Sequence, residues 1–266
     1  MPAKTKNEAT EALKQVTYLA SALKAPRITE AAARLADHAR DAGWTHEEYL
    51  AAVLDREVAA RNASGAQLRI RAAGFGARKT IEEFDWDAQP GVRQQIASLA
   101  SGGFLVEARN VVLLGPPGTG KTHLATGLGI AAAHHGHRVL FATATEWVTR
   151  LSDAHRAGRL SHELARLRRY GLIVVDEVGY LPFEQDAANL FFQLVSSRYE
   201  HASLILTSNL PFSGWGNVFG DQAVAAAMID RVVHHADVLT LKGASYRLRN
   251  RGIETLPSIK TQNPAD

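Results

Sequence analysis

One segment of eight residues, 115–122, constrains this chain more than any other part of the sequence. It reads GPPGTGKT and matches the pattern G-x-x-x-x-G-K-[S/T] in full. An apolar run at 111–114 precedes it and a helical pattern follows it, which is the strand–loop–helix setting that this pattern needs. Glycines let the backbone curl so that successive N–H groups point inward, and the following helix adds the positive end of its dipole. We therefore predict a phosphate-binding loop formed by Gly115, Pro116, Pro117, Gly118, Thr119, Gly120, Lys121 and Thr122.

Two further signals indicate how this loop would use a nucleoside triphosphate. Lys121 supplies a positive charge for the β- and γ-phosphates, and the hydroxyl of Thr122 is a ligand for Mg²⁺. A second apolar run, 172–175, leads into Asp176 and Glu177. In P-loop ATPases an Asp at this place holds the Mg²⁺ shell, and the adjacent Glu can polarise the attacking water. We therefore predict ATP and Mg²⁺ as cofactors, with Thr122 and Asp176 as the metal ligands. Lys121, Asp176 and Glu177 are the predicted catalytic residues.

A third apolar run, 204–208, ends at Asn209. An amide at this place can orient the lytic water or touch the γ-phosphate, whereas an isolated Asn after a strand is more often a turn residue. Because Asn209 follows the phosphate loop and the acidic strand in order, we assign it to the catalytic set.

After Pro90 the sequence alternates between short apolar runs and helical patterns. Near-continuous apolar runs are typical of parallel strands buried on both faces, and the helices between them supply the crossovers. We therefore predict an α/β fold with a central parallel sheet, with strands at 111–114, 139–142, 172–176, 204–208 and, as the weakest signal, 238–241.

The first part of the chain has a helical rhythm instead. Apolar residues recur at spacings of three and four between about residues 7 and 73. Thr45 with Glu48 forms a capping-box signature at the start of a third helix, and we expect this helix to bury Tyr49, Leu50, Val53, Leu54 and Val58. The predicted organisation is a small all-helical N-terminal domain over 1–75, a linker over 76–90, an ATPase domain over 91–256 and a flexible tail over 257–266.

Composition narrows the class of protein further. The formal net charge is only +3, so the distribution of charge matters more than its total. There is no cysteine, which excludes disulfides, cysteine-ligated zinc and thiol nucleophiles. The N-terminus lacks the apolar core of a secretory signal, and no apolar run approaches the roughly 18 residues of a membrane-spanning helix. We expect a cytoplasmic protein with no membrane partner.

Several segments, taken with the phosphate loop, resemble one branch of the AAA+ ATPases. They are 71–86 (RAAGFGARKTIEEFDW), 176–182 (DEVGYLP), 207–209 (TSN), 230–235 (DRVVHH) and 243–247 (GASYR). This branch includes replication initiators and helicase loaders, and the segments are most similar to IstB-like proteins, ATPases that assist a transposase in moving insertion sequences. The similarity runs from roughly residue 10 to residue 250, and IstB-like proteins usually have proline where this chain has Gly76.

The resemblance implies a regulator of transposition that oligomerises on duplex DNA when ATP is bound. It would select or remodel target DNA, recruit or activate the transposase of the same insertion sequence, and disassemble after hydrolysis. Subunits of such ATPases share their nucleotide sites, and Arg231 matches the arginine donated in trans. Without the resemblance, a helix arginine that pairs with Asp230 or faces water would be the favoured interpretation. Arg247 matches a second nucleotide-sensing cation. The helical lid is expected to be reduced or absent, and Phe84 is expected in the core rather than against adenine.

Two other functions stay open. A replicative helicase loader of the DnaC type has the same ATPase core and would engage a ring helicase through the N-terminal helices. A P-loop kinase of a small metabolite would need a substrate pocket and a mobile lid, which the sequence does not reveal.

Two basic regions are candidates for contact with DNA. Arginine-rich surfaces attract phosphates largely through counterion release. The competing interpretation is a solvated helix face with internal ion pairs, and we expect few such pairs because few acids lie nearby. The first region can instead bind a partner protein. Because no base-reading motif is visible, we predict sequence-tolerant contact with the DNA backbone. The predicted contacts are Arg69, Arg71, Arg78 and Lys79 in the first region and Arg156, Arg159, Arg166, Arg168 and Arg169 in the second.

Overall fold

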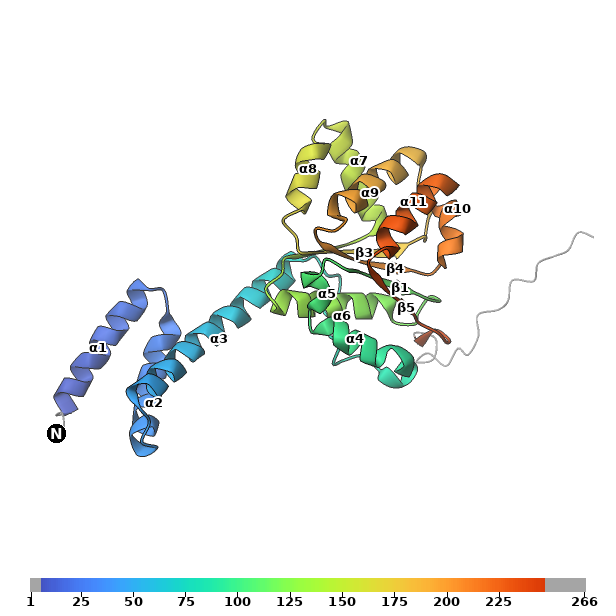
Figure 1. Ribbon diagram of the computed structural model, residues 1–266. Helices are drawn as coiled ribbons and strands as arrows, with labels where there is room; N and C mark the ends of the chain where they lie inside the picture. The colour runs from blue at the N-terminus through green and yellow to red at the C-terminus, as the bar shows by residue number, and fades with distance from the viewer. Residues whose placement is uncertain (1–5, 247–266) are drawn as a thin grey trace, which may run out of the picture. The chain divides into compact units, whose positions relative to one another are not determined.

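The computed structural model describes residues 6–246 of the chain (Figure 1). The chain divides into two compact units between Leu68 and Arg69. This boundary lies inside the long helix α3 (His46–Ala72). Of the helices within residues 6–246, none combines the length and apolar character that crossing a bilayer requires.

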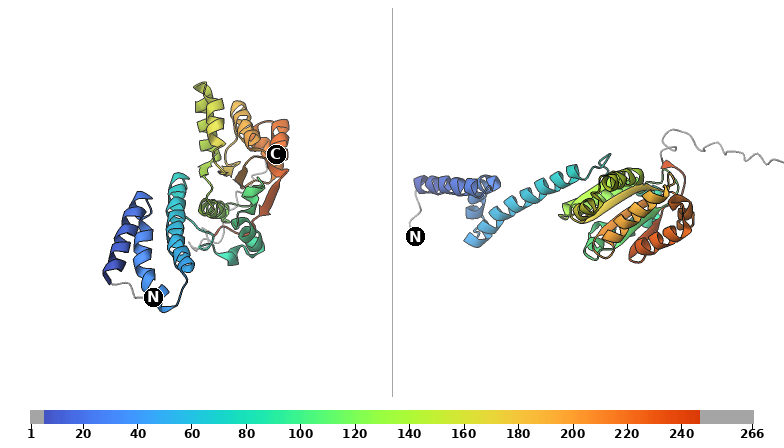
Figure 2. Two further views of the ribbon diagram at one scale, coloured as in Figure 1. Left: turned by 60° about the vertical axis from the view of Figure 1, so that its left-hand side comes forward. Right: turned by 90° about the horizontal axis from the view of Figure 1, so that it is seen from above.

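Helices alone build the N-terminal unit, as predicted. They are α1 (Lys6–Ala22), α2 (Pro26–Asp41) and the larger part of α3 (Figure 2). The predicted capping box at the start of α3 is confirmed, because Glu48 N–H donates to Thr45 Oγ1 at 3.2 Å and Thr45 N–H donates to Glu48 Oε2 at 2.7 Å. A small core of Ala31, Ala32 and Val53 holds the three helices together.

The expectation that α3 buries a broad apolar face is wrong in part. Val53 is buried and Tyr49 packs against the small core, but Leu50, Leu54 and Val58 are 56%, 45% and 54% exposed. Tyr49 and Val53 are four residues apart and share one stripe of the helix, whereas the other three residues share the neighbouring stripe. Within this unit only α1 and α2 are available to cover α3, and they cover one stripe.

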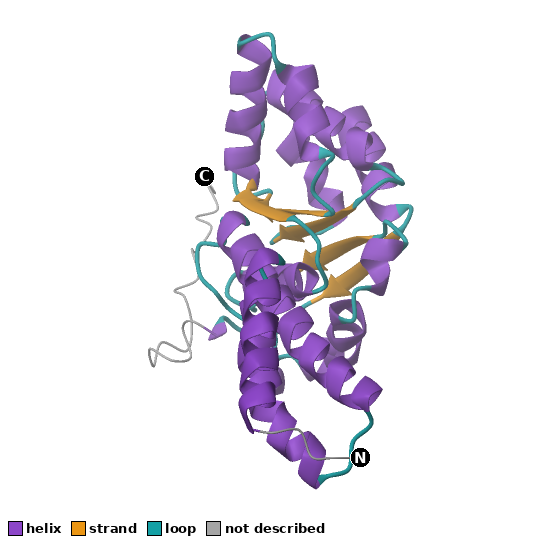
Figure 3. Cartoon of the chain, turned by 90° about the vertical axis from the view of Figure 1, so that its left-hand side faces the viewer, coloured by secondary structure: helices purple, strands orange, loops and turns teal. Residues whose placement is uncertain are grey.

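The second unit contains a five-stranded parallel sheet with the strand order β2-β3-β4-β1-β5 (Figure 3). The strands are β1 (Asn110–Leu114), β2 (Val139–Thr143), β3 (Leu172–Val178), β4 (Ser203–Ser208) and β5 (Ala236–Thr240). All five predicted apolar runs are therefore confirmed as strands, and each neighbouring pair is parallel. The strands β1 and β4 are buried along their whole length, as expected for strands covered on both faces.

Helices form a layer on each side of the sheet (Figure 1). One layer consists of α4 (Arg93–Ala100), α5 (Gly103–Val106) and α6 (Lys121–His134). The other consists of α7 (Ala144–Arg156), α8 (Leu160–Leu167), α9 (Gln185–Arg198), α10 (Trp215–Phe219) and α11 (Gln222–Val233). Short 3-10 turns at Trp86–Ala88, Pro90–Val92 and Phe212–Gly214 complete the unit. Each layer packs on the sheet through its own apolar cluster.

The parallel arrangement gathers the predicted motifs at one edge of the sheet. The strands β3, β4 and β1 are neighbours, so the residues that follow their carboxyl ends lie next to one another. In the register of the sheet, Leu114 pairs with Ser208 and Thr143 pairs with Asp176. Ligands of open α/β sheets bind outside the carboxyl ends of the strands, and this is where the phosphate loop and the two acids lie.

Part of the predicted linker, 76–90, packs along α6. The Nε2 atom of His123 on α6 lies 2.7 Å from the carbonyl oxygen of Thr80. Phe75 and Ile81 pack against the apolar cluster between α6 and the sheet. The segment before β1 is thus held beside the phosphate loop by contacts with the helix that the loop begins.

Candidate nucleotide-binding site

The phosphate loop lies between β1 and α6, as predicted. Three of its residues have positive φ angles, 147° at Gly115, 80° at Gly118 and 101° at Gly120. All three positions also lack room for a side chain, because a Cβ would lie 2.3 Å from Leu241 O at Gly115, 2.1 Å from Ser245 Oγ at Gly118 and 2.6 Å from the Phe84 ring at Gly120. Glycine is needed there for both the backbone conformation and the close approach of other segments.

The ammonium of Lys121 lies within the curve of this loop. Its Nζ donates to the carbonyl oxygen of Gly115 at 2.6 Å and to that of Pro116 at 2.8 Å. The residue is 9% exposed and is the first residue of α6, with Gly120 as the N-cap. A fixed cation and the positive end of a helix dipole therefore occupy the same place, and both favour an anion.

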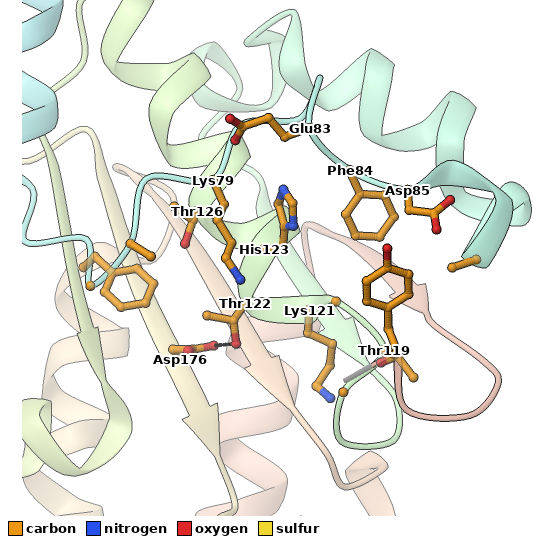
Figure 4. Close-up of a pocket in the computed structure, with 17 residues that line it drawn as sticks. Lys79, Glu83, Phe84, Asp85, Thr119, Lys121, Thr122, His123, Thr126 and Asp176 are labelled. Carbon is orange, nitrogen blue, oxygen red and sulfur yellow. Dashed lines mark hydrogen bonds between the residues drawn. The ribbon is translucent and has the colours of Figure 1, made fainter. Parts of the chain in front are cut away.

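Thr122 and Asp176 are brought into contact from separate motifs. Thr122 Oγ1 donates to Asp176 Oδ1 at 3.1 Å (Figure 4), and Thr207 Oγ1 donates to the same oxygen at 2.5 Å. Asp176 is only 4% exposed. A hydroxyl and a carboxylate oxygen are the hard oxygen ligands that Mg²⁺ prefers. The two predicted metal ligands therefore fit the ion in position and in chemistry.

Glu177 has an unusual backbone at the end of β3. Its φ angle is +63°, and a conformation of this kind costs a residue other than glycine on the order of 1–3 kcal/mol. The Glu177 side chain is exposed, whereas its neighbours Asp176 and Val178 are buried. Its backbone N–H donates to Thr207 Oγ1 at 2.9 Å. Strained residues of this kind cluster at functional sites.

A cavity of about 630 Å³ lies beside the phosphate loop, within the size range of small-molecule sites. The loop and Asp176 line part of it, and residues of the 76–88 segment line another part. Phe84 packs against Trp86 and His123 with ring centres 4.8 Å and 5.1 Å apart and is 8% exposed, so the expected core position is confirmed. Its ring also lines the cavity, as does Lys79, whose side chain points into the space beside α6 (Figure 4).

The segment after β5 forms another part of this lining. Tyr246 N–H donates to the carbonyl oxygen of Gly118 at 3.0 Å, which places Tyr246 at the cavity. The side chain of Gln89 holds the segment, because its Nε2 donates to Lys242 O at 2.5 Å and its Oε1 accepts from Lys242 N–H at 3.3 Å. The structure describes this segment only as far as Tyr246, so the expected reduction of the lid is not tested. Arg247 and the predicted tail, 257–266, lie outside the described residues.

Three predicted catalytic residues, Glu177, Asn209 and Arg231, do not line the cavity. Asn209 directly follows β4 and is half-buried. Arg231 lies on α11, with its guanidinium carbon 5.5 Å from the ring centre of Phe192 and 5.3 Å from that of Tyr199. No ion pair joins Arg231 to Asp230 in the structure. The arginine is instead held on the rings of Phe192, within α9, and Tyr199, the residue that follows α9.

In the second basic region the expectation of few ion pairs is wrong. Glu163 of α8 pairs with Arg150 at 2.6 Å and with Arg166 at 2.7 Å, and Arg156 pairs with an aspartate three residues earlier at 2.6 Å. Two of these pairs join residues three apart on one helix, and the pair of Arg150 with Glu163 joins α7 to α8. By contrast Arg159, Arg168 and Arg169 are exposed and make no ion pair with any residue in the described part of the chain.

The residues that follow α8 have a rigid support. Arg198 on α9 is 2% exposed, and its guanidinium donates to the carbonyl oxygens of Leu167, Tyr170 and Ser203 at 3.0–3.1 Å. Burial lowers the pKa of Arg198 to about 10. The exposed pair Arg168 and Arg169 therefore lies between two carbonyl groups that one buried arginine fixes.

The first basic region is dispersed. Arg69 Nε donates to the carbonyl oxygen of Ala133 at 2.8 Å and so holds the last turn of α6. Arg71 and Arg78 are exposed, and neither makes an ion pair with another residue of the range 11–246. Lys79 belongs to the cavity lining. The four residues therefore do not form one uniform basic face.

Sequence reasoning assigned no role to three residues that contact the site. Thr207 binds Asp176 and the backbone of Glu177, and Gln89 and Tyr246 hold or line the cavity. The hydroxyl of Thr207 within the otherwise apolar start of the run 204–208 was the one sequence signal that could have pointed to a polar contact of this residue. No local signal distinguishes Gln89, because its partner Lys242 lies 153 residues away in sequence.

Comparison with known proteins agrees with this site. Residues 18–253 match the family of IstB-like ATP binding proteins. An ATP-binding protein of insertion sequence IS21 from Pseudomonas aeruginosa is 40% identical over 238 residues, 89% of this chain and 90% of the relative. The corresponding protein of insertion sequence IS5376 from Geobacillus stearothermophilus is 37% identical over 233 residues, 87% of this chain and 93% of the relative. The crystal structure of the DnaC helicase loader superposes with a TM-score of 0.50 at 18% identity, covering 65% of this chain and 99% of that chain, which supports the fold alone. This chain is therefore a member of the IstB-like ATP-binding protein family, with the fold of the AAA+ P-loop ATPases.

Proposed function

We propose that this chain hydrolyses ATP and uses the nucleotide to assemble on duplex DNA as a regulator of transposition. The observation that carries the proposal is the contact between Thr122 and Asp176 beside the phosphate loop, with Glu177 next in sequence. This arrangement joins a phosphate cradle, a pair of oxygen ligands and a carboxylate at one edge of the sheet. Those are the parts that hydrolysis of a nucleoside triphosphate requires.

Each residue has a distinct task in this proposal. Lys121 exchanges its two carbonyl partners for the β- and γ-phosphates, and Thr122 with Asp176 would hold Mg²⁺. When bound, the ion neutralises charge on the phosphate oxygens. Glu177 is the general base for the attacking water. Asn209 follows β4 on the same sheet edge and orients that water.

Arg231 acts in this proposal on the nucleotide of a neighbouring copy. It lies outside the cavity lining of its own chain, and its stacking on Phe192 and Tyr199 holds the guanidinium at the surface of α11. Stacking of this kind orients a cation without neutralising it. An arginine supplied across an interface is worth roughly 10³–10⁵ in rate in related NTPases. ATP would thereby join adjacent subunits.

Contact with DNA is assigned chiefly to the exposed, unpaired arginines of the second basic region. Arg159, Arg168 and Arg169 are free to release counterions from phosphates, whereas Arg166 already pairs with Glu163. Arg71 and Arg78 are the corresponding candidates of the first region. The position of Lys79 favours the nucleotide over DNA as its ligand.

The partner in this proposal is the transposase of the same insertion sequence, and the site of action is the cytoplasm. The two relatives that share 37–40% of their residues with this chain are named for insertion sequences. The helicase loader shares 18% and shows only the fold. A neighbouring integrase-type gene would support the transposition role, whereas capture of a hexameric helicase by this chain would favour the loader.

Electron microscopy of the chain with long duplex DNA and a non-hydrolysable ATP analogue tests assembly. We expect regular oligomers on the DNA, and no assemblies with Lys121→Ala. A wild-type chain that stays monomeric with nucleotide, magnesium and DNA present would refute the proposal.

Mixing two inactive variants tests the shared site. Lys121→Ala supplies Arg231 but lacks a working loop, and Arg231→Ala has the loop but lacks the arginine. ATPase activity should return when the two are mixed, because the first can complete the site of the second. Mixtures that stay inactive while wild type is active would exclude Arg231 as a residue acting in trans.

A further inference from the structure

The two acids at the end of β3 lie opposite a single residue of β4. Val175 pairs with Leu206 and Val178 pairs with Ser208, so the register shifts between them. Asp176 and Glu177 are therefore two residues set against one, Thr207, which is the arrangement of a β-bulge. Bulges of this kind redirect a side chain, and here the redirected side chain is the exposed Glu177 between two buried neighbours.

The hydroxyl of Thr207 makes contact with both acids. Its Oγ1 donates to Asp176 Oδ1 at 2.5 Å and accepts from Glu177 N–H at 2.9 Å. A hydroxyl has one hydrogen to donate and two lone pairs to accept with, so one group satisfies both contacts at once. Thr207 is 1% exposed. Water therefore has little access to replace it.

The same hydroxyl extends to the phosphate loop through Asp176. Asp176 Oδ1 accepts from Thr122 as well as from Thr207. The far end of the bulge has a separate anchor, because Ser208 Oγ donates to Val178 O at 2.7 Å. Thr207 thus holds the acids themselves, and Ser208 holds only the backbone that follows them.

We propose that Thr207 is a positioning residue for hydrolysis, a role that rests on the proposed ATPase activity. Its hydrogen bond to Oδ1 orients the Asp176 carboxylate toward Thr122 for the metal ion. Its bond from the Glu177 N–H holds the left-handed backbone that turns the Glu177 carboxylate out of the sheet. Both effects act on the hydrolytic step and on the metal ion rather than on the affinity for nucleotide alone.

Three variants and three readouts test this role. Thr207→Val keeps the shape and removes the hydroxyl, and Thr207→Ser keeps the hydroxyl. Ser203→Ala is the matched control, because it removes a buried hydroxyl from the other end of β4, where its partner is Phe104 O. The first two readouts are turnover per bound nucleotide, which ignores any unfolded fraction, and the affinity of the nucleotide complex for Mn²⁺. A fluorescent ATP analogue without metal gives the third, the nucleotide Kd.

We expect Thr207→Val to lower both turnover and Mn²⁺ affinity by roughly 10–100-fold, the usual effect of removing a residue that orients a metal ligand. The metal-free nucleotide Kd should change by less than about threefold, since the loop itself is untouched. Thr207→Ser should regain most of both losses. Ser203→Ala should resemble wild type.

Each contrary result has a separate meaning. If Glu177→Gln abolishes turnover while Thr207→Val turns over like wild type, the positioning role is wrong. It is equally wrong if Thr207→Ser is as slow as Thr207→Val, or if Ser203→Ala shows the same losses. If the wild type does not hydrolyse ATP, the proposed function fails, and the Mn²⁺ affinities alone decide the role of Thr207.

Discussion

Replacing Gly118 by alanine should separate the phosphate loop from the segment that follows β5. The φ angle of Gly118 is +80°, and an added Cβ would lie 2.1 Å from Ser245 Oγ, 2.8 Å from Ser245 Cβ and 3.1 Å from Ser245 Cα. Rotation of the serine side chain relieves only the first of these contacts. The backbone of 241–246 therefore has to move, and the bond from Tyr246 N–H to Gly118 O has to lengthen.

The expected magnitude has two parts. A residue with a Cβ in the left-handed region costs about 1–2 kcal/mol, and an extra carbon in packed space typically costs about 1–3 kcal/mol. We therefore expect Gly118→Ala to lower the free energy of unfolding by about 2–5 kcal/mol. Nucleotide affinity should fall at least tenfold, roughly 1.4 kcal/mol, because the loop that cradles the phosphates has to shift.

A double-mutant cycle isolates the contact from the backbone cost. Ser245→Gly removes the two closest atoms, Oγ and Cβ. The double variant should therefore regain the stability lost to the steric clash and still lack the stability lost to the left-handed φ angle at position 118. Urea unfolding of the wild type, both single variants and the double variant gives the coupling free energy, expected at about 1–3 kcal/mol. Coupling below about 0.5 kcal/mol would mean additive effects. It would show that Ser245 does not lie against the loop in solution.

Three shorter predictions concern catalysis, DNA and pH. Glu177→Gln should retain ATP binding and leave the DNA-bound oligomer trapped, as seen by filter binding over time; normal turnover would remove Glu177 from the catalytic set. Arg168→Gln with Arg169→Gln should weaken DNA binding and make the slope of log affinity against log salt shallower by about 2, whereas Arg166→Gln, already paired with Glu163, should change it less. Burial, and then the charges of His135 and Arg69, lowers the pKa of His137 below its usual value of 6.5. The unfolded chain thus binds more protons at this residue, so the free energy of unfolding of the wild type should decrease as pH falls below about 6.5. His137→Gln should lose less stability over the same pH range. An equal loss in the two proteins, measured by urea unfolding above and below this pH, would contradict the prediction.

Local patterns predicted the strands and the phosphate loop because these depend on short-range chemistry. A parallel strand buried on both faces must be apolar throughout, so the run 111–114 was recognisable without its neighbours. The loop needs glycine where φ is positive and a lysine at the first residue of the helix, and both requirements are local. The meeting of Asp176 with Thr122 was predictable in outline, because parallel strands end at one edge of a sheet.

Sequence patterns gave wrong predictions where the burial or pairing of a side chain depended on which other elements pack against it. The apolar periodicity of α3 counted Leu50 and Leu54 as core, but periodicity does not say how many helices are present to cover a face. The basic stretch around Arg166 was expected to be unpaired, yet Glu163 on the same helix pairs with Arg166, and only the packing of α7 on α8 brings Arg150 to that acid as well. Lys79 was grouped with DNA contacts by its charge alone, and only the fold placed it at the cavity.

The sequence by itself determined the family, the order of the strands along the chain and the identity of the phosphate loop, because each depends on short segments of contiguous residues. The tertiary structure alone decided the register shift that sets Thr207 against two acids, and the approach of Ser245 to Gly118. Both contacts join residues far apart in the chain. Their geometry depends on strand pairing and on where β5 ends, which no local preference of the backbone specifies.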